Sequence, residues 1–168
     1  MKKIKPEELA DNPIKLIGKD WMLVTAGTPG EFNTMTASWG GVGFLWNKPV
    51  AFVFVRHERY TFAFTEREEV MTLSFFDEKY RKALSLLGTK SGRDTDKVAE
   101  SGLTPVPADN GGVTFAQARV VLECKKLYVS DLDEAKFLDK SLLDRFYDAA
   151  HGGLHRVYVA EITGVSVE

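Results

Sequence analysis

The sequence predicts a mainly β fold of the α+β kind, an antiparallel β-barrel with short inserted helices. Segments with the composition of strands dominate the chain, and the segments with helical periodicity are short. Strands and helices do not alternate in the regular βαβ order of a doubly wound sheet. The chain has no internal repeat and no linker, so we expect a single domain over residues 1–168.

The first part of the chain predicts a helical turn and then a hairpin. Pro6-Glu7-Glu8-Leu9 has proline early and acidic residues near the positive end of the helix dipole. Strands are predicted over Trp21–Ala26 and Phe32–Trp39, with Gly27-Thr28-Pro29-Gly30 as the turn between them. The glycine-rich sequence Gly40–Gly43 indicates a bend or a close backbone approach.

The middle of the chain predicts two strands around a short helix. Ala51–Val55 is apolar without alternation, which is typical of a strand buried on both faces. Val70–Phe76 alternates apolar and polar residues until its end. Between them, Arg59–Glu69 carries two phenylalanines among charged residues and is expected to form a short helix.

Two further short helices follow. We expect one over residues 77–87, with Asp77 as its N-cap and Gly88 at its end. The second is expected over residues 94–101, with Asp94 at its start and Gly102 at its end.

The last third of the chain returns to strands. Residues 104–112 are rich in Pro, Asn, Asp and Gly and are expected to form a loop. Ala118–Val129 predicts a long strand, and His155–Ile162 predicts a final alternating strand. Between them, residues 133–150 are helical or irregular.

Composition narrows the function classes. The 22 basic and 24 acidic residues nearly cancel, which predicts no nucleic-acid partner and no anionic membrane partner. A single cysteine, Cys124, excludes an internal disulfide and fits a reducing cytosol. No apolar signal segment follows Met1, and the longest apolar run, Val50–Val55, is too short to span a bilayer. We therefore expect a soluble cytoplasmic domain.

Common enzyme signatures are absent from the sequence. It has no G-x-G-x-x-G after a strand, no G-x-S-x-G elbow and no phosphate loop in the correct order. Gly152 and Gly153 separate His151 from His155 and disfavour a helix that would place both on one face, so no metal site is predicted. Cys124 lies among apolar residues and is expected to be buried and inert.

The strand Asn33–Gly40 is unusually small and polar for a core strand. Its hydroxyls, its amide and its backbone can hydrogen-bond a planar heterocycle, and Met35 and Trp39 can pack on the ring. The alternative, an ordinary edge strand with polar residues facing outward, is equally consistent with this segment taken alone.

Two basic segments predict an anion site. Arg56–Thr61 leads from a buried strand into a helix, and Lys90–Arg93 precedes another helix. Helix-start N–H groups, a threonine hydroxyl and guanidinium groups are suited to a phosphate. The alternative is solvated surface charge, the usual fate of a single Arg or Lys. With the polar strand, these segments indicate a phosphorylated heterocycle such as flavin mononucleotide (FMN).

In this order the segments resemble the flavin-reductase-like, FMN-binding split-barrel proteins, and among them the flavoredoxin branch. The resemblance is carried by Asn33–Trp39, by Arg56 and Arg59-Tyr60-Thr61, and by Gly88–Asp94. It continues through Gly102–Pro105 and the final strand His155–Val165, so that it covers nearly the whole chain. It implies a Greek-key split barrel and a homodimer with FMN near the interface.

The resemblance also implies residue roles. The residues expected along the flavin ring are Asn33, Met35, Thr36, Ala37, Ser38 and Trp39. Those expected on the phosphate side are Arg56, Arg59, Tyr60, Thr61, Lys90 and Ser91. His155 is expected near the reactive face as the catalytic residue.

Three functions remain open at the level of the sequence. The first is an FMN oxidoreductase that takes a hydride from NADH or NADPH, with the choice between the two left undecided. The second is an electron carrier of the flavoredoxin type, with tightly held FMN and a redox partner protein. The third is a non-catalytic flavin-binding or interaction module.

Overall fold

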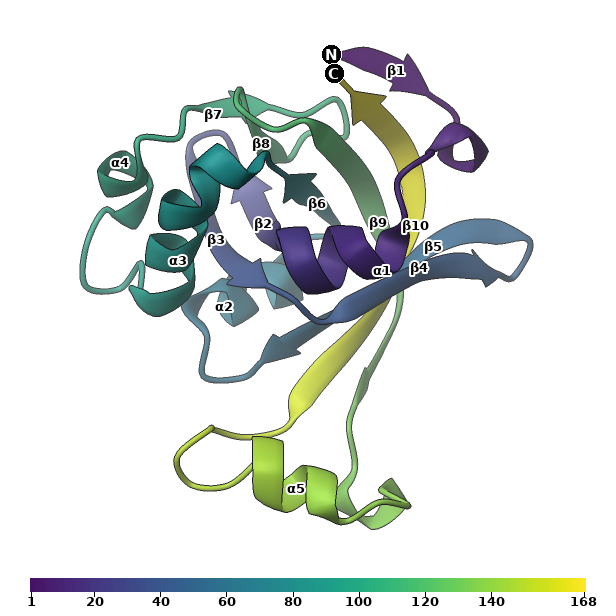
Figure 1. Ribbon diagram of the computed structural model, residues 1–168, viewed down its shortest axis with the longest axis vertical. Coiled ribbons are helices and arrows are strands. Elements are labelled where there is room, and N and C mark those ends of the chain that lie inside the picture. Colours follow the sequence, from purple (N-terminus) through teal and green to yellow (C-terminus); the bar gives the residue numbers. More distant parts are fainter.

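The computed structural model describes residues 1–168, and antiparallel strands dominate it (Figure 1). The strands are β1 (Lys2–Ile4), β2 (Met22–Thr28), β3 (Glu31–Ala37), β4 (Gly40–Leu45), β5 (Lys48–Arg56), β6 (Val70–Phe75), β7 (Pro105–Pro107), β8 (Val113–Phe115), β9 (Val120–Asp131) and β10 (His155–Val167). The α-helices are α1 (Pro13–Lys15), α2 (Tyr60–Arg67), α3 (Arg81–Thr89), α4 (Lys97–Ser101) and α5 (Ser141–Phe146). The other helical turns are the 3₁₀ turns η1 (Pro6–Glu8), η3 (Glu78–Tyr80) and η4 (Glu134–Lys136) and the π-helical turn η2 (Leu16–Asp20).

The main sheet has eight strands, and every pairing in it is antiparallel. Its order is β3-β2-β6-β9-β10-β5-β4, with β1 added on β10, while β7 and β8 form a separate ribbon. The prediction of an antiparallel β fold with short helices is therefore confirmed. The hydrogen-bonded path ends at β3 and β4 and does not close into a barrel.

The two ends of this path are neighbours along the chain. Only Ser38 and Trp39 separate β3 from β4, and a connection of that length spans roughly 10 Å at most. The end of β3 and the start of β4 therefore lie close together, so the sheet must curl. The curl encloses the larger apolar cluster, which includes Met22, Leu73 and Leu122.

A second apolar cluster lies on the outside of the sheet. Leu23 of β2 and Val121 of β9 pack there against Leu84 and Leu87 of α3. Both faces of β2 are therefore buried. Figure 1 shows α3 and α4 together on this side.

The predicted hairpin at the start of the sheet is confirmed. β2 and β3 pair from Met22 opposite Ala37 to Thr28 opposite Glu31, so that Pro29 and Gly30 form the turn. The predicted bend at Gly40–Gly43 is instead the start of strand β4. Close approach does occur there, because a Cβ on Gly40 would lie 2.9 Å from the carbonyl oxygen of Phe52.

Several predicted boundaries were wrong for local reasons. The segment 77–87 splits into the turn η3 and the helix α3. Gly88 was predicted to end this helix, but α3 continues through Gly88 to Thr89. The helix α4 begins later than predicted, with Asp96 as the cap. Strand β5 was predicted to be buried on both faces, but its residues Phe52 and Phe54 are only half-buried.

The segment between β9 and β10, residues 132–154, leaves the sheet as an arm that carries η4 and α5. Figure 1 shows this arm extending away from the sheet, opposite the end where the two termini lie. Cys124 of β9 is fully buried, and burial raises the pKa of its thiol to about 12, as expected of an inert cysteine. None of the helices combines the length and the apolar character that a membrane-spanning helix needs.

Candidate functional site

A cavity of about 200 Å³ opens where β3, the Ser38–Trp39 connection, the end of β5 and the start of β10 converge. We call it the ring-side cavity. Its lining residues are Met35, Thr36, Ala37, Ser38, Trp39, Phe54, Arg56, Arg59 and His155. The curl of the sheet brings these residues together, because β3 is the first strand in the strand order and β5 is the last but one.

The β3 wall of this cavity combines buried and open positions. Met35 is 5% exposed, whereas Thr36, Ala37 and Ser38 are half-buried. The Thr36 hydroxyl donates to the carbonyl of Leu84 in α3 at 2.5 Å, so its oxygen remains available as an acceptor. Since β3 is the edge of the sheet, one side of its backbone has no strand partner.

A second cavity of about 150 Å³ lies beside the first, and we call it the basic cavity. Its lining residues are Glu58, Arg59, Tyr60, Thr61, Thr89, Lys90, Ser91, Arg93 and Lys97. Arg59 lines both cavities. A ligand with a ring at one end and an anionic group at the other would therefore meet both.

Three cations of the basic cavity, Arg59, Arg93 and Lys97, have no counter-ion within the protein, and Arg59 and Lys97 are the less exposed of the three. Arg59 donates through Nη1 to the carbonyl of Gly88 at 2.9 Å, but its Nη2 is buried without any partner. Lys97 is 3% exposed and donates only to the carbonyls of Leu87 and Lys90, at 3.0 and 3.1 Å. Burial, together with the charge of Arg59, lowers the pKa of Lys97 to about 8.

An unpaired buried donor and an unpaired buried cation each destabilise the fold. An anion between them would relieve both, so this donor set fits a phosphate group. Thr61 adds a buried hydroxyl to the same wall.

The predicted phosphate residues therefore divide into two groups. Arg59, Tyr60, Thr61, Lys90 and Ser91 line the basic cavity, although Lys90 already pairs with Glu100. Arg56 lines the ring-side cavity instead.

Arg56 also holds the arm. Its guanidinium donates to the carbonyls of Phe146 and Gly153, at 2.9 and 2.7 Å, and lies 5.1 Å from the ring centre of Tyr147. All three residues belong to the segment between β9 and β10.

Asn33 lines neither cavity. Its Nδ2 donates to Thr61 Oγ1 at 2.7 Å, and a Cβ on Gly92 would lie 2.3 Å from its Oδ1. Asn33 therefore braces the start of α2 and the loop before α4 rather than facing the ring-side cavity. Only glycine fits at position 92 without displacing it.

His155 lies at the start of β10, opposite Arg56 of β5. It is 7% exposed, and its ring packs near the rings of Trp39 and Phe54. Its Nδ1 is 3.0 Å from the hydroxyl of Tyr147. Burial and the neighbouring Arg56 charge lower the pKa of His155 to about 4, so the ring is neutral near pH 7.

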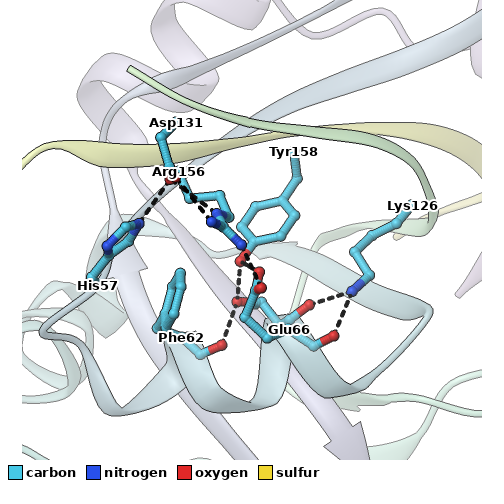
Figure 2. A network of polar contacts seen from close by, with 8 residues as sticks. His57, Phe62, Glu66, Lys126, Asp131, Arg156 and Tyr158 are labelled. Atoms are coloured by element: carbon cyan, nitrogen blue, oxygen red, sulfur yellow. Dashed lines mark hydrogen bonds and ion pairs between the residues drawn. The ribbon is translucent and has the colours of Figure 1, made fainter. Parts of the chain in front are cut away.

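A polar network fixes the helix that carries Tyr60 and Thr61 (Figure 2). Glu66, near the end of α2, accepts from Arg156 at 2.5 Å and from Tyr158 at 2.6 Å. Lys126 of β9 donates to the last carbonyls of the helix, those of Thr65 and Glu66. The helix is thereby tied to β9 and β10.

The same network reaches the base of the arm. Arg156 donates to both carboxylate oxygens of Asp131 at 2.9 Å, and His57 lies 2.8 Å from the same carboxylate (Figure 2). These contacts lower the pKa of Asp131 to about 2, with Arg156 as the main cause. The orientation of α2 thus depends on residues of β9 and β10, which are distant from it in the sequence.

Sequence reasoning missed Lys97, Phe54 and Tyr147. Lys97 resembles any surface lysine at the start of a helix, and only the packing of α4 against α3 shows its burial. The pairing of β5 with β10 places Phe54 beside His155. Tyr147 reaches the site only because the arm folds back, and no local pattern signals that.

Comparison with known proteins relates nearly the whole chain to one protein family. The model of the family described as "Flavin reductase like domain" matches residues 15–168. No curated protein matches the chain.

Solved structures share the fold at low identity. Flavoredoxin of Desulfovibrio vulgaris (Miyazaki F) is 22% identical, with a TM-score of 0.68 over 100% of this chain and 77% of that chain. An FMN-binding protein from Thermus thermophilus is 18% identical, with a TM-score of 0.68 over 100% and 78%. Nitrilotriacetate monooxygenase component B from Bacillus cereus is 16% identical, with a TM-score of 0.67 over 99% and 81%.

Proposed function

The chain belongs to the flavin reductase-like domain family, and from this premise we propose that it binds FMN and passes a hydride or electrons between NAD(P)H and that flavin. The observation that carries the proposal is the pair of uncompensated cations, Arg59 and Lys97, beside the ring-side cavity. A ring with one phosphate matches the two adjoining cavities. Proteins of similar fold include an FMN-binding protein and a component of a monooxygenase.

Each group of residues has a distinct role in this proposal. Arg59, Lys97 and Thr61 hold the phosphate, and Ser91 with the partly neutralised Lys90 borders it. Met35 and Trp39 pack on the ring. The edge backbone at Ala37 and Ser38 offers hydrogen bonds to the polar side of the ring.

The chemistry requires little from the protein beyond placement. FMN, when bound, supplies a ring that accepts a hydride and gives up electrons singly or in pairs. Neutral His155 and the rings of Trp39 and Phe54 limit the access of water to the ring-side cavity. No acid–base pair is needed for transfer of a hydride.

The proposal includes a Greek-key split barrel. The two-residue connection between β3 and β4 supports closure of the curled sheet at that point by the covalent chain rather than by hydrogen bonds.

It also includes a homodimer. Large apolar side chains stay exposed on the β4–β5 turn and on β9, and Trp46 of the turn contacts Tyr128 of β9 edge to face, with ring centres 6.4 Å apart. Phe44 is 69% exposed in the same hairpin. A second copy of the chain would cover this surface.

A flavoredoxin-type electron carrier is the second candidate. It is favoured by the likeness of the fold to flavoredoxin of Desulfovibrio vulgaris over the full length of this chain. A carrier would retain FMN through gel filtration and would react slowly with free NAD(P)H, whereas a reductase would react quickly with it.

The test is an anaerobic mixing experiment. Protein loaded with FMN is mixed with NADH and, separately, with NADPH, and the flavin absorbance is followed. Loss of the oxidised spectrum within seconds with either donor supports the reductase. Retained FMN that neither donor reduces supports the carrier, and a protein that takes up no FMN refutes both functions and leaves a non-catalytic module.

A further inference from the structure

The arm places one tyrosine hydroxyl against the histidine of the ring-side cavity. Tyr147 follows the last residue of α5, and its Oη lies 3.0 Å from His155 Nδ1. The two rings meet edge to face, with centres 5.5 Å apart. This is the one hydrogen bond that His155 makes through its side chain.

The direction of this hydrogen bond determines where His155 carries its proton. The Arg56 guanidinium lies over the Tyr147 ring at 5.1 Å, and a cation beside a phenol makes its O–H a better donor and its oxygen a poorer acceptor. Burial also raises the pKa of Tyr147, so the hydroxyl keeps its proton. A neutral imidazole that accepts at Nδ1 must carry its hydrogen on Nε2.

The other ring nitrogen remains free. His155 Nε2 has no hydrogen-bond partner in the protein. It is nevertheless not fully buried, because Arg59 Nη2 is the one side-chain nitrogen or oxygen that is both buried and without a partner. His155 Nε2 is therefore not fully enclosed, and His155 lines the ring-side cavity.

We propose that Tyr147 is a positioning residue that fixes His155 as the neutral Nε2–H tautomer, so that this wall of the ring-side cavity presents an N–H donor. The bound group opposite it would be an acceptor atom, a carbonyl oxygen or a ring nitrogen of the bound heterocycle. This second part rests on the proposed function. The arm would thereby act on the cavity without touching the ligand.

The tautomer can be read directly by NMR. Long-range ¹H–¹⁵N correlation of ¹⁵N-labelled protein without flavin gives separate patterns for the two neutral tautomers and for the cation. The chain has three histidines, and His155→Gln identifies the signals of His155. At pH 7 the expected pattern is protonated Nε2 and unprotonated Nδ1.

Tyr147→Phe removes the hydroxyl and keeps the ring under Arg56. In this variant the two ¹⁵N shifts of His155 should move toward each other, as in a mixture of tautomers. Tyr80→Phe, at a half-buried tyrosine of η3 whose hydroxyl makes no hydrogen bond within the protein, is the matched control and should leave the His155 pattern unchanged. Backbone amide spectra report whether each variant is folded. A wild-type protein protonated at Nδ1, or a folded Tyr147→Phe variant with an unaltered pattern, overturns the proposal.

Addition of FMN separates the two claims. Movement of the amide signals of Ala37 and Ser38 together with the His155 Nε2 signal supports the donor role. Movement of the amides without His155 Nε2 overturns that role. If FMN moves none of these signals, the proposed function fails, while the tautomer held by Tyr147 is still decided by the spectra without flavin.

Discussion

Lys97 is the residue whose environment most departs from what its type predicts. A lysine is rarely buried without an acidic partner, and Lys97 donates only to two backbone carbonyls. Its charge faces that of Arg59 across the basic cavity. An anion bound in the basic cavity would offset the cost of this arrangement.

Replacing Lys97 should therefore weaken the binding of FMN more than the binding of riboflavin. Lys97→Met removes the charge and keeps the length of the side chain, so FMN binding at pH 7 should weaken roughly ten- to a hundredfold. Riboflavin lacks the phosphate and should bind as before. Fluorescence titration with both flavins measures the two dissociation constants.

Lys82→Met, at an exposed position on α3, is the matched control and should change neither constant. An equal loss of affinity for both flavins in Lys97→Met would show that Lys97 supports the fold of the cavity rather than the phosphate.

His155 should make the fold sensitive to mild acid. Its pKa is about 4 in the folded chain and about 6.5 when unfolded. Between these values the unfolded chain binds the proton first, so the free energy of unfolding falls as the pH falls from 6.5 to 4. Above pH 6.5 this contribution is complete and constant.

His155→Gln removes this titration. Urea unfolding at several pH values should show a loss of stability between pH 6.5 and 4 that is smaller in the variant, by up to about 3 kcal/mol. Parallel curves for the two proteins would refute the assignment, because both share every other titrating group.

At the scale of elements, the helix α4 beside the basic cavity begins later than the sequence predicts. Asp94 stands where a cap was expected, but Asp96 accepts from the backbone N–H of Ala99 at 3.1 Å. Gly102 closes the helix in the left-handed region at φ 72°, as predicted. The later start places Lys97 in the first turn of α4.

Of the two aspartates, Asp96 should therefore be the one that stabilises α4. Asp96→Ala should cost about 1 kcal/mol of unfolding free energy, whereas Asp94→Ala should cost close to nothing, since its side chain caps no N–H. Urea unfolding of the two variants compares them directly. A larger cost for Asp94→Ala would restore the boundary that the sequence predicted.

At the scale of the whole molecule, the β4–β5 turn carries a strained tryptophan on an exposed apolar surface. Trp46 and Asn47 have φ values of 53° and 58°, the left-handed region that a two-residue hairpin of this kind requires. A tryptophan is a costly choice for such a position. Contact with a second copy would explain its presence.

Trp46→Gly should relieve the strain and remove the contact, so the proposed dimer should dissociate while the monomer remains folded. Asn47→Gly changes the neighbouring residue of the same turn and should leave the dimer intact. Light scattering after gel filtration gives the mass of each. A Trp46→Gly protein that remains dimeric would exclude this surface as the interface.

The sequence by itself determined the antiparallel strands, the first hairpin and the small polar composition of β3, whose residues from Met35 onward line the ring-side cavity. These features depend on local order: the alternation of side chains, the turn at Pro29 and Gly30, and the clustering of small polar residues in β3. Neighbours along the chain carry that information.

Only the tertiary structure decided the burial of Lys97, the split of Arg56 from Arg59, and the contact of Tyr147 with His155. Each depends on packing between segments distant in sequence: α4 against α3, the arm against β5, and β3 against β5 through the curl of the sheet. Burial and charge compensation are properties of such contacts. No local pattern records them, because the partner that buries or neutralises a side chain lies elsewhere in the chain.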